Sequence, residues 1–342
     1  MRNLLFLLIS MSTFAQKPTN ILEQLLLAHP EKFKKLTDHP EKYRLQILYT
    51  QIDRDANNKP SLTTYSYRAD TNEYFYPAST VKLAASVLAL EKLNTLKIKK
   101  ETTFQTFKNR PSQLEIKTDS TAASGLPSIA HYIKKILLVS DNEAYNRLYE
   151  FLGQRSFNES MAKKGFEGVR LTHRLQTPLP RLENQYTNPI KLIDASGKLL
   201  YQQLEAFNDK PYAANNPILL GKGTMNDAGV VEDRPLDFSL KNSYPLQAQH
   251  LFLLRLMLPE AFPKKDQFIL SKEDYQFLYR YMSMYPTESK EPAYQEEFAT
   301  YCKFLYYGSE KNAVLNPSIR IFNKVGDAYG FLLDNAYVVD FD

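Results

Sequence analysis

A serine and a lysine that can act as nucleophile and base stand three residues apart, at Ser79 and Lys82. If this segment begins a helix, both side chains lie on one face, and the lysine amine can reach the serine hydroxyl. A serine hydroxyl attacks well only when a neighbouring base takes its proton, which a desolvated lysine with a lowered pKa can do. Free N–H groups at a helix N-terminus stabilise the negative charge on an attacked carbonyl. The spacing therefore predicts acyl transfer through Ser79.

The same Ser-x-x-Lys spacing occurs a second time, from Ser160 to Lys163. Spacing alone therefore does not identify a nucleophile. The second copy stands at the polar end of a helix, just before Gly165, whereas Ser79 opens the most apolar helical stretch of the chain. We therefore predict that Ser79 is the nucleophile and that Ser160 lies on the surface.

A second motif, Ser140-Asp141-Asn142, lies on the connection between two predicted helices. One interpretation is structural, because Ser and Asp are common N-caps and a helix is predicted to start near Glu143. The other is functional: Ser140 would relay a proton to the leaving group, and Asn142 would bind a substrate amide. The residues by themselves leave both interpretations open.

A third motif, Lys324-Val325-Gly326, lies on a predicted strand that leads into a turn. A lysine on a strand is usually a solvated edge residue. In the functional interpretation, the ammonium of Lys324 attracts a substrate carboxylate and holds the relay serine in place. Gly326 would then let a substrate backbone approach the strand closely.

In this order, the three motifs resemble those of the superfamily of class A β-lactamases and penicillin-binding serine hydrolases. The resemblance implies that Ser79 is the acylated nucleophile and that Lys82 is its base or proton shuttle. It further implies a proton relay at Ser140, substrate binding by Asn142, Lys324 and Gly326, and an oxyanion hole made by the backbone N–H groups of Ser79 and Asp327.

Two residues depart from the family pattern. Class A enzymes need a Glu on a loop after the second motif, to activate the water that clears the acyl-enzyme. Residues 169–175 resemble the start of that loop, but no Glu follows at the expected step. Glu183 is the nearest candidate for this catalytic role, and it can equally be a surface residue. Val325 stands where the family has Thr or Ser, so a hydroxyl for the substrate carboxylate is missing.

Apolar periodicity and turn residues place the motifs between two strand pairs. The expected helices are 21–35 with an interruption at Pro30, the stretch that begins at Thr80, 129–139, 143–152, 246–258 and 272–284. The expected strands are 43–52, 61–67, 318–324 and 331–341, and residues 175–247 are expected to be mostly loop.

This order predicts an α+β fold with two lobes, in which helices flank an antiparallel sheet and a mostly helical lobe lies beside it. The sheet lobe would comprise residues 16–75 and 316–342, and the helical lobe residues 76–315, with a cleft between them. The middle of the chain is longer than in typical class A enzymes, which indicates an insertion within residues 185–315. The family adds a strand and a helix beyond the last strand predicted here, so we expect either a different closure of the sheet or a truncated sequence.

Residues 1–15 have the pattern of a secretion signal. Arg2 is followed by an apolar run over residues 4–11 and by small residues up to Ala15. A buried N-terminal helix is the alternative. No cysteine follows the run, so we expect no lipid or other stable membrane anchor. The predicted location is periplasmic or secreted.

Composition excludes several other classes of protein. The net charge of +5 is spread along the chain, which disfavours a nucleic-acid groove. The five histidines lie far apart in the sequence, so we expect no metal site and no cofactor. Cys302 is the only cysteine, so no intrachain disulfide can form. We expect a monomer.

The leading hypothesis is an exported serine β-lactamase that is acylated at Ser79 and hydrolyses the β-lactam amide, as in antibiotic resistance. A D-Ala-D-Ala peptidase, penicillin-binding or esterase-type enzyme with slow deacylation is the alternative, with peptidoglycan peptides as substrates. A truncated, non-catalytic binding relative is the third possibility.

Overall fold

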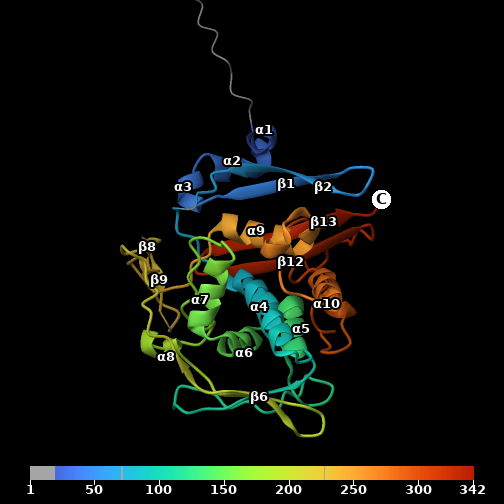
Figure 1. The fold of residues 1–342 in the computed structure, drawn as a ribbon. Coiled ribbons are helices and arrows are strands. Elements are labelled where there is room, and N and C mark those ends of the chain that lie inside the picture. The colour runs from blue at the N-terminus through green and yellow to red at the C-terminus, as the bar shows by residue number, and fades with distance from the viewer. Residues whose placement is uncertain (1–19, 71, 227) are drawn as a thin grey trace, which may run out of the picture.

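Two antiparallel β-hairpins from opposite ends of the chain lie on one side of the molecule, and most of the helices lie on the other (Figure 1). The computed structural model describes residues 20–70, 72–226 and 228–342. The first hairpin pairs β1 (Ile47–Arg54) with β2 (Pro60–Tyr67), and the second pairs β12 (Ile319–Ala328) with β13 (Phe331–Asp340). The predicted secretion signal, residues 1–15, lies outside the described residues.

Three short helices precede the first hairpin, and prolines divide them. They are α1 (Ile21–Ala28), α2 (Pro30–Thr37) and α3 (Pro40–Tyr43). Pro30 is the first residue of α2, a position where the missing N–H of proline costs no helical hydrogen bond. The interruption predicted at this residue is therefore confirmed.

The two hairpins do not join into the single hydrogen-bonded sheet that the sequence suggested. Within the described residues, β1 pairs only with β2, and β13 pairs only with β12. A cavity of about 1520 Å³ separates the facing edges of β1 and β13 and is lined by residues of both strands. Adjacent strands hydrogen-bond when they lie roughly 4.8 Å apart, and this gap keeps the two edges from doing so.

Helix α9 (Leu246–Met257) holds the two hairpins together across the gap. The imidazole Nε2 of His250 lies 2.7 Å from the hydroxyl of Thr50 in β1. The side-chain amide of Asn335 in β13 donates to the carbonyl of Gln249, at 2.9 Å. The hairpins therefore keep a fixed relation to the rest of the fold without pairing to each other.

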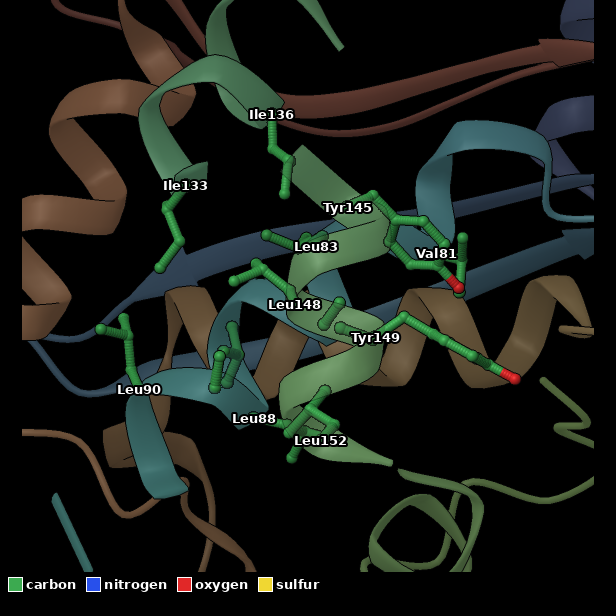
Figure 2. Packing of buried hydrophobic residues seen from close by; sticks show 14 of the residues in the cluster. Val81, Leu83, Leu88, Leu90, Ile133, Ile136, Tyr145, Leu148, Tyr149 and Leu152 are labelled. Carbon is green, nitrogen blue, oxygen red and sulfur yellow. The ribbon is translucent and has the colours of Figure 1, made fainter. Parts of the chain in front are cut away.

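The core of the helical side is built around α4 (Val81–Leu96). This helix is apolar on nearly all sides, as expected for a helix surrounded by others. Helices α5 (Ile129–Val139) and α6 (Asn142–Leu152) pack on it, and Figure 2 shows their side chains converging with those of α4. Each large aliphatic side chain buried in this way contributes about 1.5–3 kcal/mol to folding. This packing fixes the start of α4, where the first motif lies.

The remaining elements surround this core. The other helices are α7 (Gln154–Lys163), α8 (Arg181–Gln185) and α10 (Lys272–Ser283), with short 3₁₀ helices η1 (Ala78–Thr80), η2 (Pro259–Ala261), η3 (Lys264–Asp266) and η4 (Pro286–Glu288). A three-stranded sheet contains β3 (Thr103–Thr106), β5 (Ile190–Ile193) and β6 (Leu199–Gln203). Two-residue strands pair as β4 (Tyr186–Thr187) with β7 (Ala206–Phe207), β8 (Leu219–Leu220) with β11 (Leu236–Asp237), and β9 (Thr224–Met225) with β10 (Val231–Glu232).

The predicted α+β fold is confirmed. The small sheets within residues 186–237 were not predicted, because their strands are too short to show an alternating pattern. None of the helices in the described ranges is long and apolar enough to cross a membrane. In the same part of the chain, no three His, Cys, Asp or Glu side chains lie close enough to share a metal ion.

Candidate active site

Ser79 lies in η1, directly before the buried helix α4. Its side chain is half-buried, whereas Lys82, one turn further on, is completely buried. The residue before the serine, Ala78, has a φ of 45°, in the left-handed region that non-glycine residues rarely adopt. Strained backbone of this kind tends to occur at functional sites. The turn before α4 thus holds Ser79 at the surface and sends Lys82 inward.

The hydroxyl of Ser140 is the point where the three motifs meet. Ser140 ends α5 with a φ of 58°. The ammonium of Lys82 donates to the carbonyl oxygen of Ser140 and to its hydroxyl, the latter at 3.1 Å. The ammonium of Lys324 donates to the same hydroxyl at 2.8 Å and to the carbonyl of Val325 at 2.9 Å. The fold therefore brings two lysines from distant parts of the chain to one serine.

The surroundings favour the neutral form of Lys82. Burial is the main cause that lowers its pKa well below the usual value, and the positive charge of Lys324 adds to the effect. Burial also lowers the pKa of Lys324, to about 8. Two ammonium groups on one hydroxyl repel each other, so the pair is most stable with a single charge. A neutral Lys82 can accept a proton, and a charged Lys324 can attract an anion.

The second motif combines the structural and the functional interpretation. The carboxylate of Asp141 accepts a hydrogen bond from the backbone N–H of Ala144, at 2.8 Å, and so caps α6. Asn142, the first residue of α6, donates its side-chain amide to Gln176, at 2.7 Å. The capping turn leaves the Ser140 hydroxyl free to contact the two lysines. Helix capping and a functional role for Ser140 are therefore compatible.

Gly326 allows β12 to lie directly against the turn that carries Ser79. A Cβ atom at this position would lie 2.8 Å from the carbonyl oxygen of Pro77 and 2.9 Å from the side chain of Leu333. Any side chain here would push the strand away from the turn. The sequence indicated that Gly326 would let a substrate backbone approach the strand. In the structure, the missing side chain lets β12 approach the Ser79 turn, which brings the third motif to the first.

The backbone N–H of Asp327 points to the free edge of β12. The hairpin turn contains only Tyr329 and Gly330, so Ala328 and Phe331 form a hydrogen-bonded pair and Asp327 a non-hydrogen-bonded one. The N–H of Asp327 is therefore turned away from β13, and β12 packs against η1 on the Ser79 side. This orientation suits the predicted oxyanion role, which needs only the backbone. The side chain of Asp327 is exposed.

Glu183 is engaged by partners outside the three motifs. Its carboxylate accepts two hydrogen bonds from Arg110, at 2.8 and 3.0 Å, and another from the hydroxyl of Ser112. These bonds lower the pKa of Glu183 to about 2, with Arg110 as the main cause. Among the described contacts, no hydrogen bond or ion pair joins Glu183 to Ser79, Lys82 or Ser140. The carboxylate of this predicted base is thus directed to Arg110 and Ser112, and its catalytic role stays a prediction.

Gln176 and Tyr76 adjoin the motifs but were not found by reasoning from the sequence. Gln176 meets Asn142 across 34 residues of sequence. The ring of Tyr76, three residues before Ser79, is buried and stacks on the imidazole of His173, with 6.3 Å between the centroids. Neither contact can be predicted from the spacing of residues in the sequence, because both depend on how the loop after α7 folds back over the site.

A buried lysine that shares a hydroxyl with a second lysine, one turn after a half-buried serine, is an arrangement that suits acyl transfer to a serine. A family model described as the beta-lactamase enzyme family matches residues 32–209, more than half of the chain. A beta-lactamase from Burkholderia phymatum has a similar structure, with a TM-score of 0.50 and 17% identity over 93% of this chain and 85% of that chain. A beta-lactamase from Desulfarculus baarsii DSM 2075 has a TM-score of 0.46 and 16% identity over 92% and 83% of the two chains.

The similarity to the structure from Burkholderia phymatum shows the fold alone. The family rests on the match of the family model to the sequence. A comparison with curated proteins finds no match. The chain belongs to the beta-lactamase enzyme family.

Proposed function

We propose that this protein is a serine hydrolase whose Ser79 is acylated by β-lactams and that it hydrolyses the β-lactam amide. One observation carries the proposal: Lys82 is completely buried and shares the hydroxyl of Ser140 with a second lysine, Lys324. This arrangement favours a neutral amine next to the half-buried serine at neutral pH, which is what activation of a serine nucleophile requires.

In the proposed acylation step, the amine of Lys82 takes the proton of Ser79 as the serine oxygen attacks the lactam carbonyl. The N–H groups of Ser79 and Asp327 stabilise the oxyanion. The C–N bond of the lactam then breaks. The leaving nitrogen takes the proton of the Ser140 hydroxyl, which regains a proton from Lys82. Lys324 attracts a carboxylate on the substrate. Val325 has no hydroxyl that could donate a hydrogen bond to the same carboxylate.

Release of the acyl group by water is the second step, and it needs a base. No Glu stands in the sequence at the position where the family has this base. The pairing of Glu183 with Arg110 and Ser112 specifically favours the second candidate function. In that case the protein is a penicillin-binding peptidase or esterase that is acylated at Ser79 and deacylates slowly.

A chromogenic cephalosporin and a fluorescent penicillin distinguish these functions when used on the mature protein and on its Ser79→Ala and Ser160→Ala variants. Continuous turnover that only Ser79→Ala abolishes supports a β-lactamase. A stable label on Ser79 without turnover supports the slow enzyme. If neither reagent reacts at Ser79, both functions are wrong, and the non-catalytic alternative remains.

We also propose that the protein is exported, because residues 1–15 have the charge and hydropathy pattern of a secretion signal. Expression of the full chain in a Gram-negative host tests this. Recovery of a periplasmic protein that begins at Gln16 is the expected result, and an intact cytoplasmic protein that begins at Met1 would contradict it.

A further inference from the structure

A cavity of about 740 Å³ adjoins the Ser79 site and has no part in the proposed chemistry. Each of the three motifs is next to one of its walls. Tyr76 precedes the first motif by three residues, Gln176 accepts a hydrogen bond from Asn142 of the second, and Tyr329 lies in the hairpin turn after the third. A substrate bound at Ser79 therefore has this cavity within reach for its remaining groups.

Positive charge predominates on the walls of the cavity. The charged wall residues are Arg174, Arg181, Lys210, Lys241 and Asp237. Two of the four basic side chains already have carboxylate partners: Arg174 pairs with Glu150, and Lys210 with Glu159. In the described part of the chain, no ion pair engages Arg181 or Lys241. Hydrogen bonds from Ser239 are the main cause that lowers the pKa of Asp237, and the charge of Lys241 adds to the effect, but no carboxylate is in ion-pair contact with Lys241 or Arg181 in the described residues. Both side chains can therefore still contact a ligand.

Lys241 is held at the wall rather than extended into solvent. Its ammonium lies over the ring of Tyr329, 4.2 Å from the centroid, and the residue is half-buried. Both residues line the cavity. A cation positioned on an aromatic ring keeps its charge and is partly desolvated, which strengthens its attraction for an anion.

His173 also lines the cavity, and its ring is neutral. Its Nδ1 lies within hydrogen-bond distance of the carbonyl of Arg174, so Nδ1 carries the proton and donates. Its Nε2 is covered by protein atoms and has no hydrogen-bond partner among the described residues. Burial lowers the pKa of His173 to about 4, which keeps the ring neutral. His173 therefore adds no charge to the walls, and the basic side chains determine the charge of the cavity.

We propose that this cavity binds the acyl side of the substrate and selects acyl groups that carry a free carboxylate, held by Lys241 and Arg181. The inference rests on the proposed acylation of Ser79. It adds the class of acyl group, which the three motifs leave open.

Two p-nitrophenyl esters with the same chain length test the inference: the monoester of adipic acid, which ends in a carboxylate, and the ester of hexanoic acid, which ends in a methyl group. The second-order rate of Ser79 acylation is measured by the p-nitrophenol burst, with the adduct located by mass spectrometry. We expect the adipate ester to react about 10- to 100-fold faster, as one partly desolvated charge contact would give. Lys241→Met should reduce this ratio to near one, with Lys241→Gln as a second, polar replacement. Lys163→Met, at an exposed lysine remote from the motifs, is the matched control and should keep the ratio.

The possible failures are distinguishable. If Ser79 is acylated by both esters at equal rates, or if Lys241→Met and Lys241→Gln keep the full ratio, the inference is wrong and the proposed function stands. If neither ester acylates Ser79 while a fluorescent penicillin does, the inference is wrong and the proposed function stands. If the penicillin also fails to label Ser79, the proposed function fails and the inference fails with it. Thermal melts of each variant show whether a lost ratio comes from a lost fold.

Discussion

The two Ser-x-x-Lys segments of this chain have the same spacing and opposite surroundings. Ser79 and Lys82 stand at the start of the buried helix α4, and Lys82 is 0% exposed. Ser160 and Lys163 stand at the end of α7, where Lys163 is exposed. In both segments, helical geometry places the two side chains on one face. The difference lies in what surrounds the lysine.

The spacing places the lysine close to the serine in both segments. Burial is what lowers the pKa of the lysine, so that its amine can act as a base. Burial is the main cause that lowers the pKa of Lys82, and the charge of Lys324 adds to it. The Lys82 amine also lies 3.1 Å from the hydroxyl of Ser140. The segment at Ser160 lacks the burial that produces this effect. Four predictions can sharpen or break the comparison.

Removing the nucleophile should have the largest effect. We expect Ser79→Ala to lower the rate of acylation by a fluorescent penicillin by at least about 10³-fold, because no other group can form the ester. Ser160→Ala should react like the unmodified protein. The label is followed by gel fluorescence and peptide mapping. Labelling that survives in Ser79→Ala and disappears in Ser160→Ala would reverse the comparison.

Removing the base should come next. Lys82→Met keeps the length of the side chain and loses the amine, so we expect acylation to slow by about 10²- to 10⁴-fold. Lys163→Met is the matched control and should change the rate by less than about twofold, since surface substitutions rarely matter. Stopped-flow acylation rates and melting temperatures are measured together. Equal decreases in the acylation rate of the two variants would show that the burial of Lys82 does not contribute to acylation.

The close contact behind Ser79 can be tested by a single methyl group. Gly326→Ala places a Cβ atom 2.8 Å from the carbonyl oxygen of Pro77. Such overpacking costs about 1–3 kcal/mol of unfolding free energy. Because the strand must move away from the Ser79 turn, acylation should slow as well. Urea denaturation and acylation rates measure both effects. An unchanged stability would contradict the packing described here.

The smallest predicted effect is a change in the pH profile of acylation. Lys82 must be neutral and Lys324 charged, so kcat/KM should fall at low pH as Lys82 gains a proton. It should fall again, by up to about tenfold per pH unit, above the pKa of Lys324 near 8.

Lys324→Arg keeps the charge at all relevant pH values, so the fall at high pH should move upward by more than about one unit. The profile is measured from pH 5 to 10 with one β-lactam that has a carboxylate. A high-pH limb that stays in place in Lys324→Arg would show that another group titrates there.

Much of the fold could be predicted where the signal is local. Helix α5 runs over residues 129–139, as its apolar periodicity predicted, and the break at Pro30 lies where proline requires it. The gap between β1 and β13 could not be predicted, because pairing between strands from opposite ends of a chain depends on the packing between them. The partners of Glu183 could likewise not be predicted, since Arg110 lies 73 residues away in the sequence.

By itself, the sequence determined which residues can do chemistry and where each stands on its own element. Ser79 and Lys82 share a helical face because the α-helix repeats every 3.6 residues, and Gly326 precedes a turn that the residue types predict. Apolar residues after Ser79 already favoured a buried helix there, but only the tertiary structure shows that Lys82 is 0% exposed, since burial depends on helices far apart in sequence. It also decided that Lys324, 184 residues from Ser140, donates to the same hydroxyl as Lys82. Contacts over such distances follow from packing and desolvation, which no local pattern records.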